Sequence, residues 1–115
     1  MYVESAQNIK KISVNAPGAL NVIKQSLVGP AQGWEGWVMR LFTVAPGGQT
    51  PRHSHSWPHI NYIVSGEGTV YLNGREQNVQ PGYSAYVPGG AEHQFINRGQ
   101  QDFVFICIVP EEGDV

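Results

Sequence analysis

Apolar residues recur along the chain in short β-prone runs that glycine and proline interrupt, a pattern typical of short strands rather than long helices. Residues 37–44 are apolar at nearly every position, and Pro46-Gly47-Gly48 is expected to end that run. A single helical turn is expected only within residues 2–9. We expect strands over residues 19–28, 37–44, 50–55, 59–64, 69–72, 76–79, 84–87, 93–97 and 102–109.

Turn signals between these runs support an all-β fold. Asn73-Gly74 separates two β-prone runs, and both residues accept the positive φ of a type I′ hairpin turn. Pro81-Gly82 marks a further turn. Short strands at this spacing predict a sandwich or a small barrel.

Composition and charge narrow the class of protein. The 115 residues, 41% of them hydrophobic, predict one domain over 1–115, because two domains would each be too small to hold a core. The single cysteine, Cys107, excludes a framework of intramolecular disulfides. A formal net charge of −2 without runs of like charge indicates no nucleic-acid partner. The longest apolar run and the first residues lack the features of a membrane helix or a leader, so we expect no membrane association and a cytoplasmic protein.

The four histidines of the chain are the main candidates for chemistry, and three of them lie within seven residues: His53, His55 and His59, with His93 further on. On a strand, side chains two residues apart point to the same side, so the first two imidazoles can share a metal. Pro58 cannot join a strand ladder, and a turn there would bring His59 back toward the same centre. The alternative is a surface loop with three solvated histidines.

Two ordered blocks of the sequence resemble the two motifs of the cupin family. The first, about residues 48–68, has a glycine, His-x-His, a short gap, a further ligand position and a glycine. The second, about residues 82–97, matches G-x5-P-x-G-x2-H-x3-N at every fixed position. The run that leads through Pro-Gly-Gly into His-Ser-His is similar to small single-domain bacterial cupins that bind manganese through four histidines.

This resemblance implies the cupin double-stranded β-helix, a jelly-roll barrel, with a metal held inside it. It puts His53 and His55 on the ligand positions of the first motif and His93 on that of the second. Most metal cupins carry a glutamate where Ile60 stands here, whereas His59 lies one residue earlier, as in the four-histidine subset. The implied site is therefore His53, His55, His59 and His93. If His59 does not bind the metal, the site consists of His53, His55 and His93.

The cofactor we expect is one divalent transition metal. Imidazole suits iron, nickel, zinc and copper, and the resemblance adds manganese, which we favour. Four protein ligands on a six-coordinate ion would leave two positions for water, dioxygen or a bidentate substrate. A site without a carboxylate would keep the full charge of the metal and favour anionic or chelating substrates.

Several other side chains have two interpretations. Cys107 is expected to be a small buried hydrophobe, with a thiol beside the metal pocket as the alternative. Arg40 interrupts an apolar strand and is expected to face outward, with an anchor for an anionic substrate as the alternative. Trp57 is a candidate for the mouth of the pocket. The side chains expected to fill the core or line the cavity are Tyr62, Phe95, Phe103 and Phe105. The candidate acid or base groups near the motifs are Glu67, Glu92 and Tyr86.

These observations predict a metal-dependent enzyme that acts on a small organic molecule. Because all the histidines are assigned to the metal, no imidazole is left as a general base, and we favour an oxygenase-type reaction. The alternatives are a metal-dependent isomerase, cyclase or lyase with a sugar-like substrate, and a non-enzymatic module that binds a metal or a small molecule. The resemblance also implies a homodimer that packs sheet on sheet or exchanges an edge strand.

Overall fold

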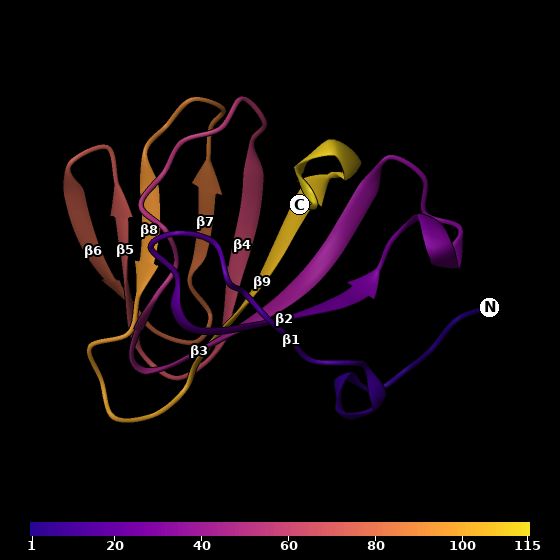
Figure 1. The fold of residues 1–115 in the computed structure, drawn as a ribbon, viewed down its shortest axis with the longest axis horizontal. Coiled ribbons are helices and arrows are strands. Elements are labelled where there is room, and N and C mark those ends of the chain that lie inside the picture. The colour runs from indigo at the N-terminus through magenta and orange to yellow at the C-terminus, as the bar shows by residue number, and fades with distance from the viewer.

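A computed structural model describes residues 1–115 and is built almost entirely from β-strands (Figure 1). The three helices are single 3-10 turns, η1 (Ala6–Asn8), η2 (Pro30–Gln32) and η3 (Glu111–Gly113). The nine strands are β1 (Ile12–Ser13), β2 (Leu20–Val28), β3 (Trp37–Gln49), β4 (His59–Ser65), β5 (Gly68–Leu72), β6 (Arg75–Val79), β7 (Ser84–Val87), β8 (His93–Ile96) and β9 (Phe103–Pro110). The all-β class that the sequence predicts is confirmed, and none of the helical turns is long and apolar enough to cross a membrane.

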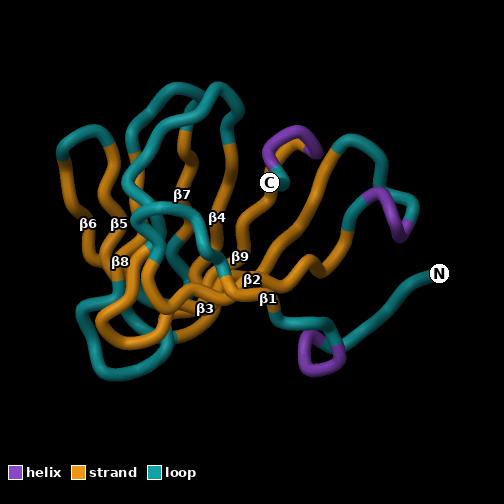
Figure 2. Tube along the Cα trace, in the orientation of Figure 1, coloured by secondary structure: helices purple, strands orange, loops and turns teal.

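All nine strands belong to one antiparallel sheet that curls around a common interior (Figure 2). The order along the sheet is β6-β5-β8-β3-β9-β4-β7, and β2 pairs with β3 and carries β1 on its other side. Neighbouring strands are thus often far apart in the chain, as β3 and β9 are. This arrangement brings the beginning of β4 and the beginning of β8 to the same interior.

Strand β3 is longer than the sequence suggests, and the prediction that Pro46-Gly47-Gly48 ends it is wrong. The strand bends at this point, where Gly47 has a φ of +80°, and continues to Gln49. The Gly47 amide donates to the Asn97 carbonyl at 3.0 Å, and the Asn97 amide donates to the Gly48 carbonyl at 3.0 Å. A bend that keeps its hydrogen bonds lets one strand pair first with β9 and then with β8.

The strand expected over residues 50–55 is also wrong. Only His53 pairs there, in an isolated bridge with His93 whose two backbone hydrogen bonds measure 3.2 and 2.9 Å. Pro51 has no amide hydrogen and cannot take part in a ladder. The segment is therefore an irregular connection that is held to β8 by the His53 bridge and by Thr50, whose amide donates to the Phe95 carbonyl at 2.9 Å.

The hairpin predicted at Asn73-Gly74 is confirmed, with φ values of +47° and +86° at its two turn residues. It joins β5 to β6 with Leu72 opposite Arg75. Within the second block of the sequence, Asn97 ties a turn as expected. Its side-chain amide donates to the carbonyls of Val44 and Gln101 at 2.8 and 2.7 Å.

The hydrophobic core fills one part of the interior and leaves the other part to polar side chains. Phe103 and Phe105 are almost fully buried, and the Phe95 ring stacks on Phe105 with centroids 4.2 Å apart. Along β9 every second residue faces inward, so the strand presents Phe103, Phe105, Cys107 and Val109 to the interior. The same alternation on β4 turns His59, Asn61 and Ile63 inward.

Candidate metal centre

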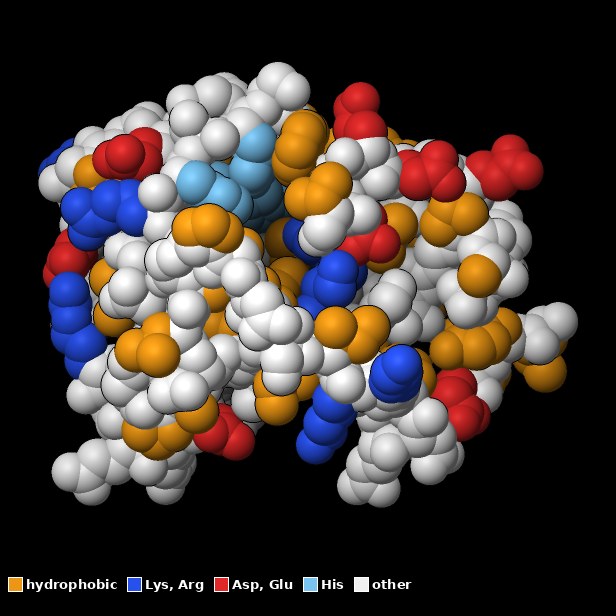
Figure 3. Space-filling view, in the orientation of Figure 1, with side chains coloured by type: hydrophobic (Ala, Val, Ile, Leu, Met, Phe, Trp, Pro, Cys, Tyr) orange, Lys and Arg blue, Asp and Glu red, His pale blue; other side chains and the backbone are white.

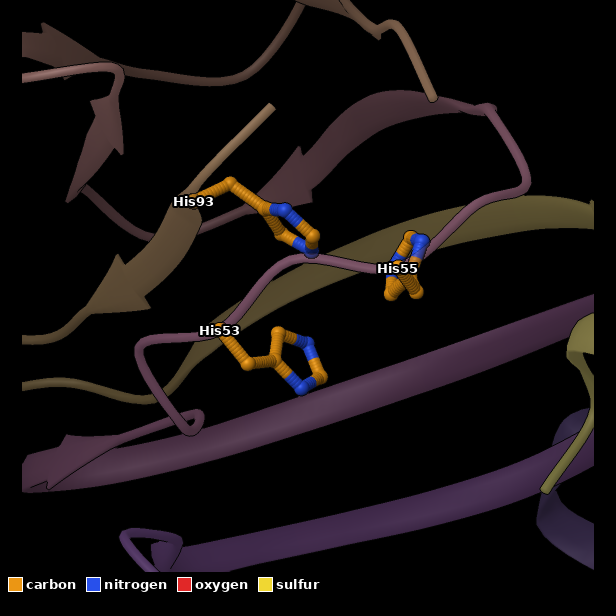
Figure 4. Close-up of side chains that lie close together, drawn as sticks. All are labelled: His53, His55 and His93. Carbon is orange, nitrogen blue, oxygen red and sulfur yellow. The ribbon is translucent and has the colours of Figure 1, made fainter. Parts of the chain in front are cut away.

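The four histidines come from residues 53–59 and from β8, and their rings lie close together, with His59 and His93 buried and His53 exposed. The centroid of the His93 ring is 4.8 Å from that of His53, 4.7 Å from that of His55 and 4.8 Å from that of His59. One ring nitrogen from each of His53, His55 and His93 lies within 4.8 Å of the other two. Figure 4 shows these three rings turned toward a common space from two different segments of the chain.

Each histidine is placed by a different local feature. His93 begins β8, and its bridge with His53 holds that residue directly opposite. The backbone carbonyl of His55 accepts a hydrogen bond from the Gly90 amide at 2.7 Å, which holds the segment around His55 against the loop that precedes β8. The chain then turns through Trp57-Pro58, as expected, and His59 begins β4 with its ring beside those of His55 and His93.

The hydrogen bonds of the Nδ1 atoms determine which ring nitrogen of each histidine has a lone pair available for a metal. Three rings have an oxygen acceptor at Nδ1: His55 with Trp57 O at 2.8 Å, His59 with Asn61 Oδ1 at 2.7 Å, and His93 with Ala91 O at 2.9 Å. Because a carbonyl oxygen only accepts, each of these Nδ1 atoms carries the hydrogen of a neutral ring. The Nε2 atom then has a free lone pair, which is the form that binds a metal.

The distance between two of these Nε2 atoms fits a shared cation. Nε2 of His59 lies 3.2 Å from Nε2 of His93, and neither has a hydrogen to donate to the other. Two ligands on one ion, each ~2.1 Å from it, are about 3.0–3.4 Å apart at octahedral or tetrahedral angles. The donor set and its spacing therefore suit a divalent transition metal.

Burial favours the neutral form of His59, His93 and His53. It lowers the pKa of His59 to about 3 and that of His93 to about 4, against the 6.5 of a free imidazole. The hydrogen bond that His59 donates to Asn61 raises the pKa of His59, and the neighbouring rings lower both pKa values further. The pKa of His53 is lowered by the same burial and by His55. A metal would not have to displace protons from these rings at neutral pH.

His59 rather than Ile60 faces the centre. His59 is buried with 6% of its surface exposed, whereas Ile60 is 50% exposed on the opposite face of β4. The alternation along the strand also turns Asn61 inward, where its side chain accepts from His59. Asn61 was not identified as a site residue from the sequence, although its spacing from His59 on a predicted strand was a sufficient signal.

The histidines stand at the edge of a cavity of about 540 Å³ with largely apolar walls (Figure 3). The walls include the rings of Phe42, Phe95 and Phe105. The Trp57 indole also lines the cavity and stacks on His55 with centroids 4.6 Å apart. Of the other aromatic candidates, Phe103 belongs to the core and Tyr62 is 49% exposed, so neither lines the cavity.

The expectation that Arg40 faces outward is wrong. Its side chain is buried and lines the cavity, and its NH2 atom lies 3.1 Å from the Cys107 sulfur. Cys107 is both small and buried, as expected, and part of the cavity wall, which was the alternative. Burial raises the pKa of its thiol, and Arg40 offsets this increase only in part.

The remaining charged candidates lie away from the cavity. Glu92 accepts a hydrogen bond from the Tyr71 hydroxyl at 2.7 Å near the surface, and Tyr86 is 62% exposed. Glu67 is not among the lining residues either. Arg52 is not among the lining residues and lies over the Tyr71 ring, with Cζ 3.8 Å from the ring centroid. Besides the histidines and the aromatic walls, the side chains that line the cavity include Asn61, Arg40 and Cys107.

Comparison with known families is consistent with this architecture. Residues 40–109, more than half of the chain, match the Cupin_2 family model, described as a cupin domain. The chain belongs to the cupin family. Both motif histidine groups and the cavity-lining Arg40 and Cys107 fall within the matched segment.

Among characterised relatives, auxin-binding protein T92 of Nicotiana tabacum is 35% identical over 72 residues, which are 54% of this chain and 38% of that protein. The oxalate-binding protein of Thermotoga maritima is 30% identical over 74 residues, 61% of each chain. The chain thus matches less than two thirds of the length of either relative.

Solved structures extend the likeness over nearly the whole chain. The polyketide cyclase RemF from Streptomyces resistomycificus superposes with a TM-score of 0.90 and 30% identity, covering 96% of this chain and 79% of that one. A predicted oxalate decarboxylase from Thermotoga maritima gives a TM-score of 0.83 at 24% identity, covering 95% and 98%. These similarities confirm the jelly-roll fold expected for a small cupin.

Proposed function

We propose that this cupin is a metal-dependent enzyme in which His53, His55, His59 and His93 hold one divalent transition metal. The observation that carries the proposal is the pair of Nε2 lone pairs of His59 and His93, which face each other at 3.2 Å in a buried site. Four neutral imidazoles do not select one metal, and manganese stays the prediction made from the sequence.

The substrate we propose is a small, largely apolar molecule that carries oxygen donors. When bound, a divalent metal supplies Lewis-acid activation of a carbonyl oxygen. The rings of Phe42, Phe95 and Phe105 would hold the apolar body of the substrate and exclude water. Trp57, stacked on His55, would close the cavity over it. Apolar aromatic walls favour a polyketide-like molecule over a sugar-like one.

For the reaction, we propose ring closure at a carbonyl group of the substrate. RemF is a polyketide cyclase, and its 30% identity over 96% of this chain supports chemistry of this kind here. The neutral donor set fits a non-redox role, since four imidazoles leave the charge of the cation available to polarise an oxygen. The chain's own contribution is to bind the substrate body and to hold its carbonyl oxygen beside the histidines.

The second candidate is the oxygenase reaction predicted from the sequence. It is favoured by the ionisable side chains that line the cavity beside the histidines, which are Arg40, Lys24 and the thiol of Cys107. The cavity wall holds no carboxylate side chain, and the nearby Asp114 is paired with Lys24 and Arg40 at 3.4 and 3.7 Å, whereas an enolising cyclase needs a proton acceptor. A non-enzymatic binding module would show metal binding without turnover.

One experiment separates the two reactions. Metal-free protein is loaded with manganese, zinc, iron, nickel or copper in turn and assayed with aromatic β-ketone compounds, in air and without oxygen. The cyclase proposal predicts turnover that needs the metal and persists without oxygen. Turnover that stops when oxygen is removed and consumes oxygen in air would contradict the cyclase and support the oxygenase.

A further inference from the structure

Three polar residues form a row across three neighbouring strands on the floor of the cavity. Arg40 on β3 is the Cα partner of Cys107 on β9, and Cys107 is in turn the partner of Asn61 on β4. All three side chains are buried and line the cavity. On one side of this row the next residues along the same faces are apolar, Phe42, Phe105 and Ile63, and on the other side of Asn61 the next inward residue of β4 is His59.

Two nitrogen atoms in this row have no hydrogen-bond partner. They are Nε of Arg40 and Nδ2 of Asn61, on side chains that are 8% and 4% exposed. Both are donors, and a buried donor without a partner destabilises the folded protein. They are the buried unsatisfied side-chain atoms of this protein, and both lie in the same cavity. Such a pair indicates an acceptor that a ligand supplies.

The charge of Arg40 is only loosely balanced. Its NH1 atom is 3.7 Å from Oδ1 of Asp114, but the same oxygen lies closer to Lys24, at 3.4 Å. The NH2 atom reaches the sulfur of Cys107, a weak acceptor that carries no charge as a thiol. One carboxylate is thus shared by two cations, and a buried guanidinium favours a further negative group.

The row adjoins the candidate metal site directly. Asn61 Oδ1 accepts from Nδ1 of His59, so one side chain contacts both a histidine and the free space of the cavity. Arg40 lies over the ring of Phe42, 4.9 Å from its centroid, which adds an apolar wall beside the cation. A ligand in this space would meet aromatic walls on its body and two N–H donors at one end.

We propose that Arg40 and Asn61 form a subsite for a negatively charged oxygen, the carboxylate or enolate oxygen of an aromatic substrate. Nε of Arg40 and Nδ2 of Asn61 donate to this oxygen, and the Phe42 and Phe105 rings contact the body of the molecule. This subsite adds to the proposed function and rests on it. The proposed function supplies the other end of the substrate, the carbonyl oxygen that faces the histidines.

The test uses benzoate as the anionic aromatic probe and benzyl alcohol as its uncharged counterpart, with the full chain free of metal and loaded with zinc. Calorimetry measures the two affinities, and NMR follows the Nε–H signal of Arg40 and the side-chain amide of Asn61. We expect both signals to shift with saturation on adding benzoate, and benzoate to bind at least about tenfold more tightly, the size typical of a hydrogen bond to a charged group. Equal affinities, or benzoate binding that moves neither signal, would overturn the subsite.

Variants give the matched comparison. Arg40→Met is expected to weaken benzoate about tenfold or more and to leave benzyl alcohol unchanged, while Arg52→Met, outside the cavity, changes neither. If Arg40→Met does not fold, the wild-type comparison decides. Metal content is measured on the same samples, so a protein that binds benzoate through Arg40 but takes up no metal would retain the subsite and contradict the proposed metal enzyme.

Discussion

Nε2 of His59 faces Nε2 of His93 across 3.2 Å, and the hydrogen of each ring is on the other nitrogen. Two lone pairs at this distance repel each other unless a cation or a proton lies between them. Burial opposes the proton, because it lowers the pKa values of these rings to about 3 and about 4. The pair is therefore suited to a metal ion and to little else at neutral pH.

The first prediction concerns His59. Replacing it, as His59→Phe, should weaken metal binding by about 100-fold or more, above the roughly 10- to 100-fold cost of losing a partner that only orients a ligand. Competition with a coloured chelator measures the affinity. The control is Ile60→Ala, next in the chain but on the outer face, which should bind metal like the wild type. A His59→Phe protein with wild-type affinity would show that only the other three histidines bind.

Acidification should destabilise the metal-free protein. The folded-state pKa values of His59 and His93 lie below 6.5, so the unfolded chain binds more protons than the folded one as the pH falls below 6.5. The free energy of unfolding should therefore decrease between pH 6.5 and 5, by at most about 1.4 kcal/mol per pH unit for each fully buried ring.

Urea unfolding at several pH values checks this slope. The double variant His59→Phe/His93→Phe should lose most of it, since the two groups that gain protons on unfolding are gone. The same slope in the wild type and the double variant would mean that other groups, not these imidazoles, control the acid sensitivity.

Gly68 should tolerate no side chain. A Cβ atom there would lie 2.3–2.4 Å from atoms of the Phe103 ring, which is fully buried and has no space to move. Gly68→Ala should lower the free energy of unfolding by about 1–3 kcal/mol, the usual cost of overpacking a core. Gly99→Ala, whose Cβ would meet Asn97 Oδ1 at 3.4 Å, is the milder control in the same urea assay. Equal stabilities for the two variants would contradict this account.

The homodimer stays a prediction from the sequence, and the outer face of β4 and β7 is where we expect it to form. Ile60, Tyr62 and Tyr86 are 50%, 49% and 62% exposed there. Light scattering at micromolar concentration should give twice the mass of the chain, and Tyr86→Lys should shift the protein toward monomer. A wild-type monomer under these conditions would remove the prediction.

Most strands could be predicted because alternation and the Asn73-Gly74 turn are local patterns. The approach of the histidine rings was expected, but residues 50–55 form no strand, and the bridge of His53 to β8 holds that segment in place. Binding of a metal by the four histidines stays a prediction. The long-range pairing of β3 with both β9 and β8 has no local signal, so the continuation of β3 through Pro46 was missed.

The inward direction of Arg40 was missed for a related reason. A single charge in an apolar strand normally faces water, and only the curl of the sheet creates an interior wide enough to hold it. Asn61 was not predicted as a site residue because it lies outside the histidine positions of the motifs. The period of two along β4 nevertheless turns it inward.

Metal content tests the central claim most directly. Untagged protein, purified without nickel resin, should contain about one divalent transition metal per chain by plasma mass spectrometry, and anomalous diffraction at the absorption edge of that element should put the peak between the rings of His59 and His93. Protein without stoichiometric metal, or a peak at a position remote from these rings, would contradict the account.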